Sequence, residues 1–135
     1  MKHKTTVDVV SQFVARINAG DLEGLCALMT DDFTFIDYRG KVECGKDVMR
    51  VGFKGYFSDY PQYKIITQKV LTGGTGVAII GQTRGSHVPR EVEEKETVLW
   101  TADVRDGHVA TWRIYADTDT VNQAVQEKPH GCTKT

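Results

Sequence analysis

The order of the predicted elements constrains the fold of this chain more than any other feature of the sequence. Three segments carry apolar side chains at the three- and four-residue spacing of amphipathic helices: residues 7–20, 21–29 and 45–60. Longer segments bounded by glycine-containing turns then follow, as in a meander of strands: residues 63–71, 77–84, 93–104 and 108–116. Helices first and strands afterwards favour an α+β fold, in which an antiparallel sheet carries the helices on one face.

A first strand is expected at residues 33–38, between the second and third helices, and a short second strand at residues 42–44. A short helix is expected near residues 120–126. The mixed charges of residues 90–96 are typical of a solvated strand edge.

Composition excludes several classes of protein. The 135 residues suffice for one domain, expected to span residues 1–135 with an ordered core at about 5–126 and a flexible tail at 127–135. The 17 Lys and Arg residues are balanced by 18 Asp and Glu residues. The chain therefore lacks the basic surplus that is typical of nucleic-acid-binding proteins. The sequence has neither a membrane-spanning apolar run nor a signal peptide, which predicts a cytoplasmic protein. Three cysteines without CxxC spacing predict no metal site, and no motif predicts a cofactor.

Three segments resemble a known superfamily: residues 13–24 (FVARINAGDLEG), 31–37 (DDFTFID) and 104–117 (VRDGHVATWRIYAD). They are similar to the ketosteroid isomerase-like and SnoaL-like families of the nuclear-transport-factor-2-like superfamily, over about residues 7–120. The resemblance implies a cone-shaped fold, in which a strongly bent antiparallel sheet wraps around three N-terminal helices and an apolar pocket opens between them. It also implies a homodimer that packs the outer sheet faces together.

Asp37 is the strongest candidate for chemistry. Strand alternation places it on the same face as Phe33 and Phe35, and a carboxylate among aromatic side chains loses hydration and takes up a proton more readily. The residues alone leave open that Asp37 is instead solvated at the strand end or paired with Arg39. The resemblance favours the inward position, because the ketosteroid isomerases have at the matching position an aspartate that moves a proton between carbons next to a carbonyl.

The partners of that base are less well matched. The tyrosine that holds the enolate in the isomerases corresponds to Phe13, which has no donor, and their neutral aspartic acid corresponds to Trp100, whose indole N–H is a donor. Trp100 or a nearby tyrosine is therefore expected to hold the enolate oxygen. The SnoaL-like cyclases use an acidic residue near a histidine, and Asp37 and His87 are the similar residues here.

The resulting hypothesis is a cofactor-free enzyme that isomerises, cyclises or dehydrates a small hydrophobic carbonyl compound, with Asp37 as general base. The alternatives are a protein that binds such a ligand without catalysis and a structural dimer module. The residues expected to contact the ligand are mostly aromatic: Phe13, Phe35, Phe53, Tyr56, Phe57, Thr83, His87, Trp112 and Ile114.

Overall fold

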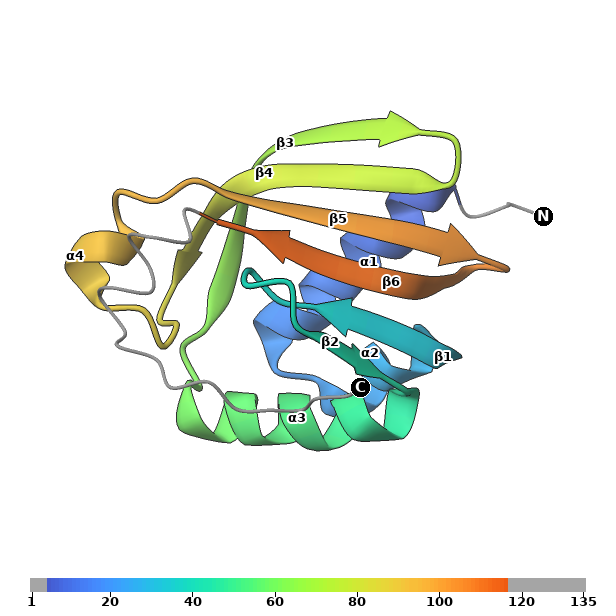
Figure 1. Cartoon of the computed structure of the whole chain (residues 1–135), viewed down its shortest axis with the longest axis horizontal. Helices are drawn as coiled ribbons and strands as arrows, with labels where there is room; N and C mark the ends of the chain where they lie inside the picture. Colours follow the sequence, from blue (N-terminus) through green and yellow to red (C-terminus); the bar gives the residue numbers. More distant parts are fainter. Residues whose placement is uncertain (1–4, 117–135) are drawn as a thin grey trace.

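Six strands form one curved sheet in the computed structural model, which describes residues 5–116 (Figure 1). The strands in chain order are β1 (Met29–Ile36), β2 (Val42–Cys44), β3 (Lys64–Gly73), β4 (Gly76–Arg84), β5 (Val98–Arg105) and β6 (His108–Tyr115). Their order in the sheet is β2-β1-β6-β5-β4-β3. All neighbours are antiparallel except β1 and β6, which pair in parallel. The predicted α+β arrangement is confirmed, with one parallel pair that the sequence did not predict.

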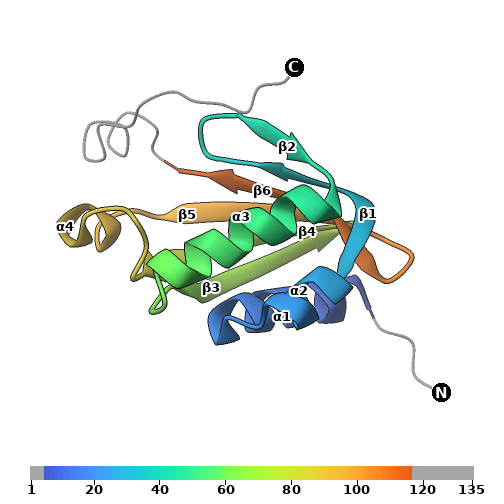
Figure 2. The ribbon, with the colours of Figure 1, turned by 90° about the horizontal axis from the view of Figure 1, so that it is seen from below.

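Three helices lie on one face of this sheet: α1 (Thr6–Ala19), α2 (Leu22–Ala27) and α3 (Lys46–Asp59), seen from below in Figure 2. The short helix α4 (Arg90–Glu93) lies at one end of β4 and β5. The local sequence explains the bounds of α1. Thr5 and Asp8 form a capping box at its start, and Gly20 ends it in the left-handed conformation at φ 65°, as the sequence predicts.

The core lies between α1 and the concave face of the sheet. The ring of Phe13 on α1 packs against Phe33 of β1 at a centroid distance of 5.9 Å and against Trp112 of β6 at 4.9 Å. Trp100 of β5 is buried in the same cluster. These contacts fix α1 across the sheet and leave the space under α3 for a pocket.

The sheet bends at β3 and β4, as Figure 1 shows. The register of the two strands shifts between Thr67 and Lys69, which is a β-bulge, and bulges increase strand curvature. Gly81 of β4 faces this bend, where a Cβ atom would collide with the carbonyl oxygen of Ile66. The glycine therefore permits the close approach of the two strands.

The bounds predicted for two strands were wrong. The strand expected at residues 93–104 begins only at Val98, because residues 90–93 form α4. The first strand begins earlier than expected, at Met29, and ends at Ile36, so that Asp37 lies in the turn that follows it. The helix expected near residues 120–126 and the expected tail lie outside the described residues.

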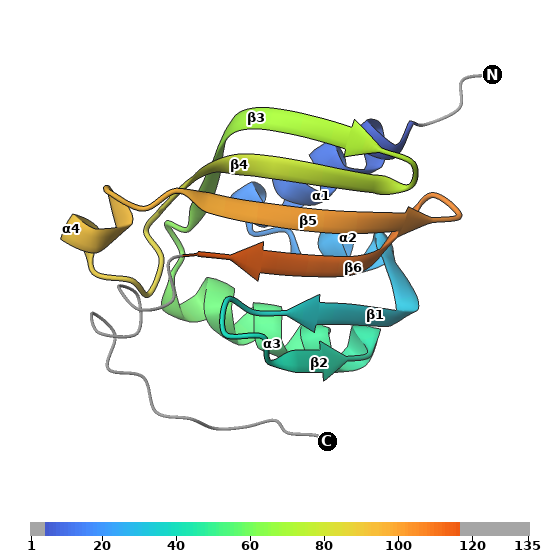
Figure 3. The same ribbon diagram turned by 45° about the horizontal axis from the view of Figure 1, so that its top comes forward.

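The other face of the sheet is uncovered within residues 5–116, and Figure 3 shows it in front of the three helices. No helix in that part of the chain is long and apolar enough to cross a membrane.

Candidate functional site

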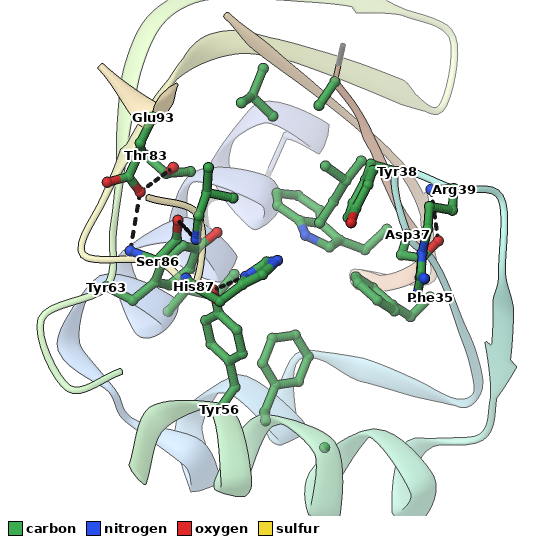
Figure 4. Close-up of a pocket in the computed structure, with 18 of the residues that line it drawn as sticks. Phe35, Asp37, Tyr38, Arg39, Tyr56, Tyr63, Thr83, Ser86, His87 and Glu93 are labelled. Atoms are coloured by element: carbon green, nitrogen blue, oxygen red, sulfur yellow. Dashed lines mark hydrogen bonds and ion pairs between the residues drawn. The ribbon is translucent and has the colours of Figure 1, made fainter. Parts of the chain in front are cut away.

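A cavity of about 290 Å³ opens between α3, the concave face of the sheet and the loop of residues 85–89. Its apolar wall comes mainly from α3, β1 and β6, and its polar side chains gather at two places (Figure 4). The lining residues that matter below are Phe35, Asp37, Arg39, Phe53, Tyr56, Tyr63, Thr83, Ser86, His87, Glu93, Trp112 and Ile114.

Asp37 and Arg39 lie on one side of this cavity. Asp37 Oδ1 accepts the backbone N–H groups of Arg39 at 2.8 Å and of Lys41 at 3.0 Å, which closes the β1–β2 turn. Asp37 Oδ2 lies 3.6 Å from Arg39 Nη2, as an ion pair. One carboxylate oxygen is thus used by the turn, while the other faces a cation at the edge of the cavity.

Tyr56 and His87 lie on the opposite side (Figure 4). The Tyr56 hydroxyl is 2.9 Å from His87 Nδ1 and also accepts the backbone N–H of His87 at 3.2 Å. The rings of Tyr60 and Tyr63 pack edge-on or tilted against Tyr56, at centroid distances of 4.7 and 5.1 Å. The pair is therefore part of an aromatic cluster between the end of α3 and the loop.

Burial favours the neutral form of two of these phenols, Tyr56 and Tyr63. It raises the pKa of Tyr56 well above the ordinary value, although the backbone N–H of His87 acts in the opposite direction. Burial likewise raises the pKa of Tyr63. Tyr56 therefore retains its proton at neutral pH and remains a hydrogen-bond donor.

Glu93 is the buried charged side chain of the site. Its Oε2 accepts the Thr83 hydroxyl at 2.7 Å and the backbone N–H of Ser86 at 3.1 Å. Burial raises the pKa of this carboxyl, but the hydrogen bonds from Ser86, Thr83 and the Gly85 backbone outweigh burial, and its pKa is lowered overall. Glu93 is thus an ionised acceptor that joins α4 to the end of β4.

The structure brings most of the expected ligand contacts to the cavity wall: Phe35, Phe53, Tyr56, Thr83, His87, Trp112 and Ile114, together with Asp37. Three expected site residues lie elsewhere. Phe13 and Trp100 are fully buried in the core, and Phe57 packs behind Phe53 at a centroid distance of 5.7 Å. Tyr56 and His87 are among the donors at the cavity, whereas the Trp100 indole is buried in the core.

Glu93 is the functional candidate that sequence reasoning missed, because the charges of residues 90–96 suggested a solvated edge. That expectation was wrong at this position, where Glu93 is only 5% exposed. One signal was present in the sequence. Pro89 directly precedes Arg90, and proline is favoured at the start of helices.

Residues 5–116 contain no group of three or more His, Cys, Asp or Glu side chains that could hold a metal ion.

Comparison with solved structures gives the same fold in proteins of low sequence identity. A protein of unknown function with a cystatin-like fold from Xanthomonas campestris has a TM-score of 0.75 at 17% identity, covering 92% of this chain and 99% of its own. A candidate SnoaL-like polyketide cyclase from Jannaschia sp. CCS1 has a TM-score of 0.72 at 17% identity, covering 96% and 100%. An NTF2-like protein of unknown function from Cytophaga hutchinsonii ATCC 33406 has a TM-score of 0.70 at 15% identity, covering 87% and 95%.

A search of curated proteins finds no significant match. The family profile of the SnoaL-like domain, however, matches residues 10–112, which include the helices α2 and α3, the strands β1 to β5 and most of the residues that line the cavity. The chain therefore belongs to the SnoaL-like domain family and has its NTF2-like, cystatin-like fold.

Proposed function

We propose that this protein is a cofactor-independent acid–base catalyst for a small hydrophobic carbonyl compound. One observation carries the proposal: a carboxylate, Asp37, and a hydrogen-bonded pair, Tyr56 and His87, line the same apolar cavity from opposite sides. General acid–base catalysis needs a proton acceptor and a hydrogen-bond donor placed on either side of the reacting group.

The Tyr56–His87 pair supports a donor role at the carbonyl oxygen. The Tyr56 oxygen accepts the His87 backbone N–H, so its own proton is available to Nδ1 of the ring. A neutral imidazole with Nδ1 as acceptor carries its proton on Nε2. His87 Nε2–H is then the group that would donate to a developing enolate oxygen.

Asp37 supports the role of base through Oδ2, the oxygen that the turn does not use. Oδ2 takes a proton from the carbon next to the carbonyl, and the electron pair of that C–H bond becomes the enolate. Return of the proton to another carbon completes an isomerisation. Attack of the enolate carbon on a second carbonyl gives a cyclisation, and loss of a β-hydroxyl group as water gives a dehydration.

The size of the cavity sets the size of the substrate. An apolar cavity of about 150 Å³ accommodates benzene, so a cavity of about 290 Å³ has room for roughly two fused six-membered rings. Aromatic side chains from Phe35, Phe53 and Trp112 line it, which favours a flat, apolar compound.

A bicyclic ketone, β-tetralone, tests the first step. We expect the wild-type chain to catalyse the exchange of the α-protons of β-tetralone with D₂O. Proton NMR measures the rate of this exchange. Asp37→Asn keeps an oxygen for the turn but removes the base, so we expect exchange to fall by at least about a hundredfold. Binding of β-tetralone, measured by saturation-transfer NMR, should persist. Asp31→Asn on the exposed part of β1 is the matched control and should exchange at the wild-type rate.

One observation favours the alternative, a protein that binds such a ligand without catalysis. Both oxygens of Asp37 already have partners, Oδ1 in the backbone N–H groups of the turn and Oδ2 in the Arg39 guanidinium, as in a purely structural carboxylate. Binding of β-tetralone without catalysed exchange would establish that alternative and overturn the enzyme proposal.

A further inference from the structure

The loop that carries His87 is held from three sides. At its start, Gly85 has φ +72° and lies so close to the backbone of Gln62 that a Cβ atom would come within 2.6 Å of the Gln62 carbonyl oxygen. Next, the Ser86 N–H is bound by Glu93, and then the His87 N–H is bound by Tyr56. Three consecutive residues thus contact three separate parts of the chain: Gly85 lies against Gln62, Ser86 is bonded to α4 and His87 to α3.

Glu93 supplies the contact at Ser86, and its side chain is buried. It is the one buried charged side chain within residues 5–116. A single oxygen, Oε2, accepts both the Thr83 hydroxyl and the Ser86 N–H, and the Ser86 hydroxyl in turn accepts the N–H of Val88. A buried ionised carboxylate is costly unless such hydrogen bonds satisfy it, so its position is tightly constrained by them.

We propose that Glu93 is a positioning residue for His87, which fixes the loop through Ser86 so that the imidazole presents Nδ1 to Tyr56. The catalytic consequence of this inference rests on the proposed function, whereas the orientation of the ring does not. Glu93 acts on His87 through its hydrogen bond to the backbone of Ser86, the preceding residue. The orientation of the His87 ring depends on the position of one carboxylate oxygen of Glu93. The negative charge of Glu93 alone is not sufficient to orient the ring.

Three variants separate position from charge. Glu93→Gln keeps an acceptor oxygen at the same distance along the side chain and removes the charge. Glu93→Asp keeps the charge but shortens the side chain by one methylene group. Glu93→Ala removes the acceptor. Glu91→Gln, exposed on the same helix α4, is the matched control.

The readout is the tautomer of His87 in the ligand-free full chain, read from the ring nitrogen shifts of protein labelled with ¹⁵N-histidine at about pH 8.5, where imidazole is neutral. His87→Gln identifies the signal. We expect wild type, Glu93→Gln and Glu91→Gln to show one tautomer with the proton on Nε2. Glu93→Asp and Glu93→Ala should show averaged shifts of a ring that exchanges between tautomers.

A wild-type His87 signal in folded Glu93→Asp would overturn the inference, and this variant decides the matter if Glu93→Ala does not fold. An averaged signal in Glu93→Gln would also overturn it, because charge would then be the determinant. The exchange of β-tetralone protons separates this inference from the proposed function. If both hold, Glu93→Asp lowers the exchange rate at saturating ketone by about tenfold to a hundredfold with little change in KM. If the tautomer changes and the exchange rate does not, Glu93 still positions His87, and the donor role that the proposed function gives to His87 fails.

Discussion

The Tyr56 hydroxyl binds His87 twice, at the ring nitrogen Nδ1 at 2.9 Å and at the backbone N–H at 3.2 Å. The two residues are 31 positions apart in the sequence, one on α3 and the other in the loop after β4. This contact joins the helix that forms the floor of the cavity to the loop that closes its end. Removing one oxygen atom should therefore affect both the loop and the chemistry.

Tyr56→Phe is predicted to keep the fold and to release His87. The ring of phenylalanine preserves the packing against Tyr60 and Tyr63, whereas both hydrogen bonds to His87 are lost. We expect the exchange of β-tetralone protons to fall by about tenfold to a hundredfold, since the imidazole is no longer oriented. Tyr60→Phe is the control, because it removes a neighbouring hydroxyl that makes no hydrogen bond to His87. Equal rates in wild type and Tyr56→Phe would contradict this role of the pair.

Because the phenols of Tyr56 and Tyr63 are shielded from water, we predict that the folded chain loses stability at alkaline pH. Burial raises the pKa values of Tyr56 and Tyr63 in the folded chain above the value of about 10 in the unfolded chain. Above about pH 10 the unfolded chain therefore releases protons that the folded chain retains. The free energy of unfolding should then fall by up to about 1.4 kcal/mol per pH unit for each buried phenol.

Urea titrations on either side of that pH measure the effect. Tyr63→Phe should weaken the fall in stability between about pH 9 and pH 11, since one of the two phenols no longer titrates. A Tyr63→Phe chain with the full wild-type slope would show that Tyr63 ionises freely in the fold.

Asn18 joins the end of α1 to β3 and predicts a specific loss of stability. Its side-chain Nδ2 donates to the carbonyl of Ile65 at 3.0 Å, and its Oδ1 accepts the N–H of the same residue at 2.7 Å. Asn18→Ala leaves both backbone groups of a buried residue without this partner, which costs about 1–3 kcal/mol in the free energy of unfolding. Chemical denaturation measures the cost, with Gln68→Ala on the exposed part of β3 as the control. A change below about 0.5 kcal/mol would mean that water replaces the amide.

Local patterns in the sequence predicted the elements that depend on local contacts. The spacing of apolar residues in α1 and the glycine that ends it, Gly20, are sufficient to place that helix. The same spacing places Phe53 and Tyr56 of α3 on one face, and both line the cavity. Strand alternation likewise brought Trp112 and Ile114 to the wall.

The roles that depend on tertiary contacts were not predictable in this way. Glu93 is one of several charged residues in sequence, and only the approach of Thr83 and Ser86 makes it a buried acceptor. Trp100 looked like a donor at the site because the resemblance aligned it there, but its side chain is buried in the core cluster. Asp37 lines the cavity and also pairs with Arg39 just after the strand end, the arrangement that the residues alone left open. Its attachment to the β1–β2 turn depends on backbone N–H groups that a residue pattern does not reveal.

The uncovered face of the sheet predicts the oligomeric state. Ile80, Leu99 and Tyr115 lie side by side across β4, β5 and β6 on this face, and Tyr115 is 40% exposed. An apolar row on an open sheet is suited to packing against the same row of a second copy, and the resemblance implies such a homodimer. Light scattering coupled to size exclusion should give the mass of a dimer for the wild type and of a monomer for Leu99→Lys, because a buried unpaired lysine is costly at a dimer interface. Val51→Lys on α3, where Val51 is 71% exposed, should leave the mass unchanged. A monomeric wild type, or a Leu99→Lys chain that still dimerises, would place the interface elsewhere or remove it.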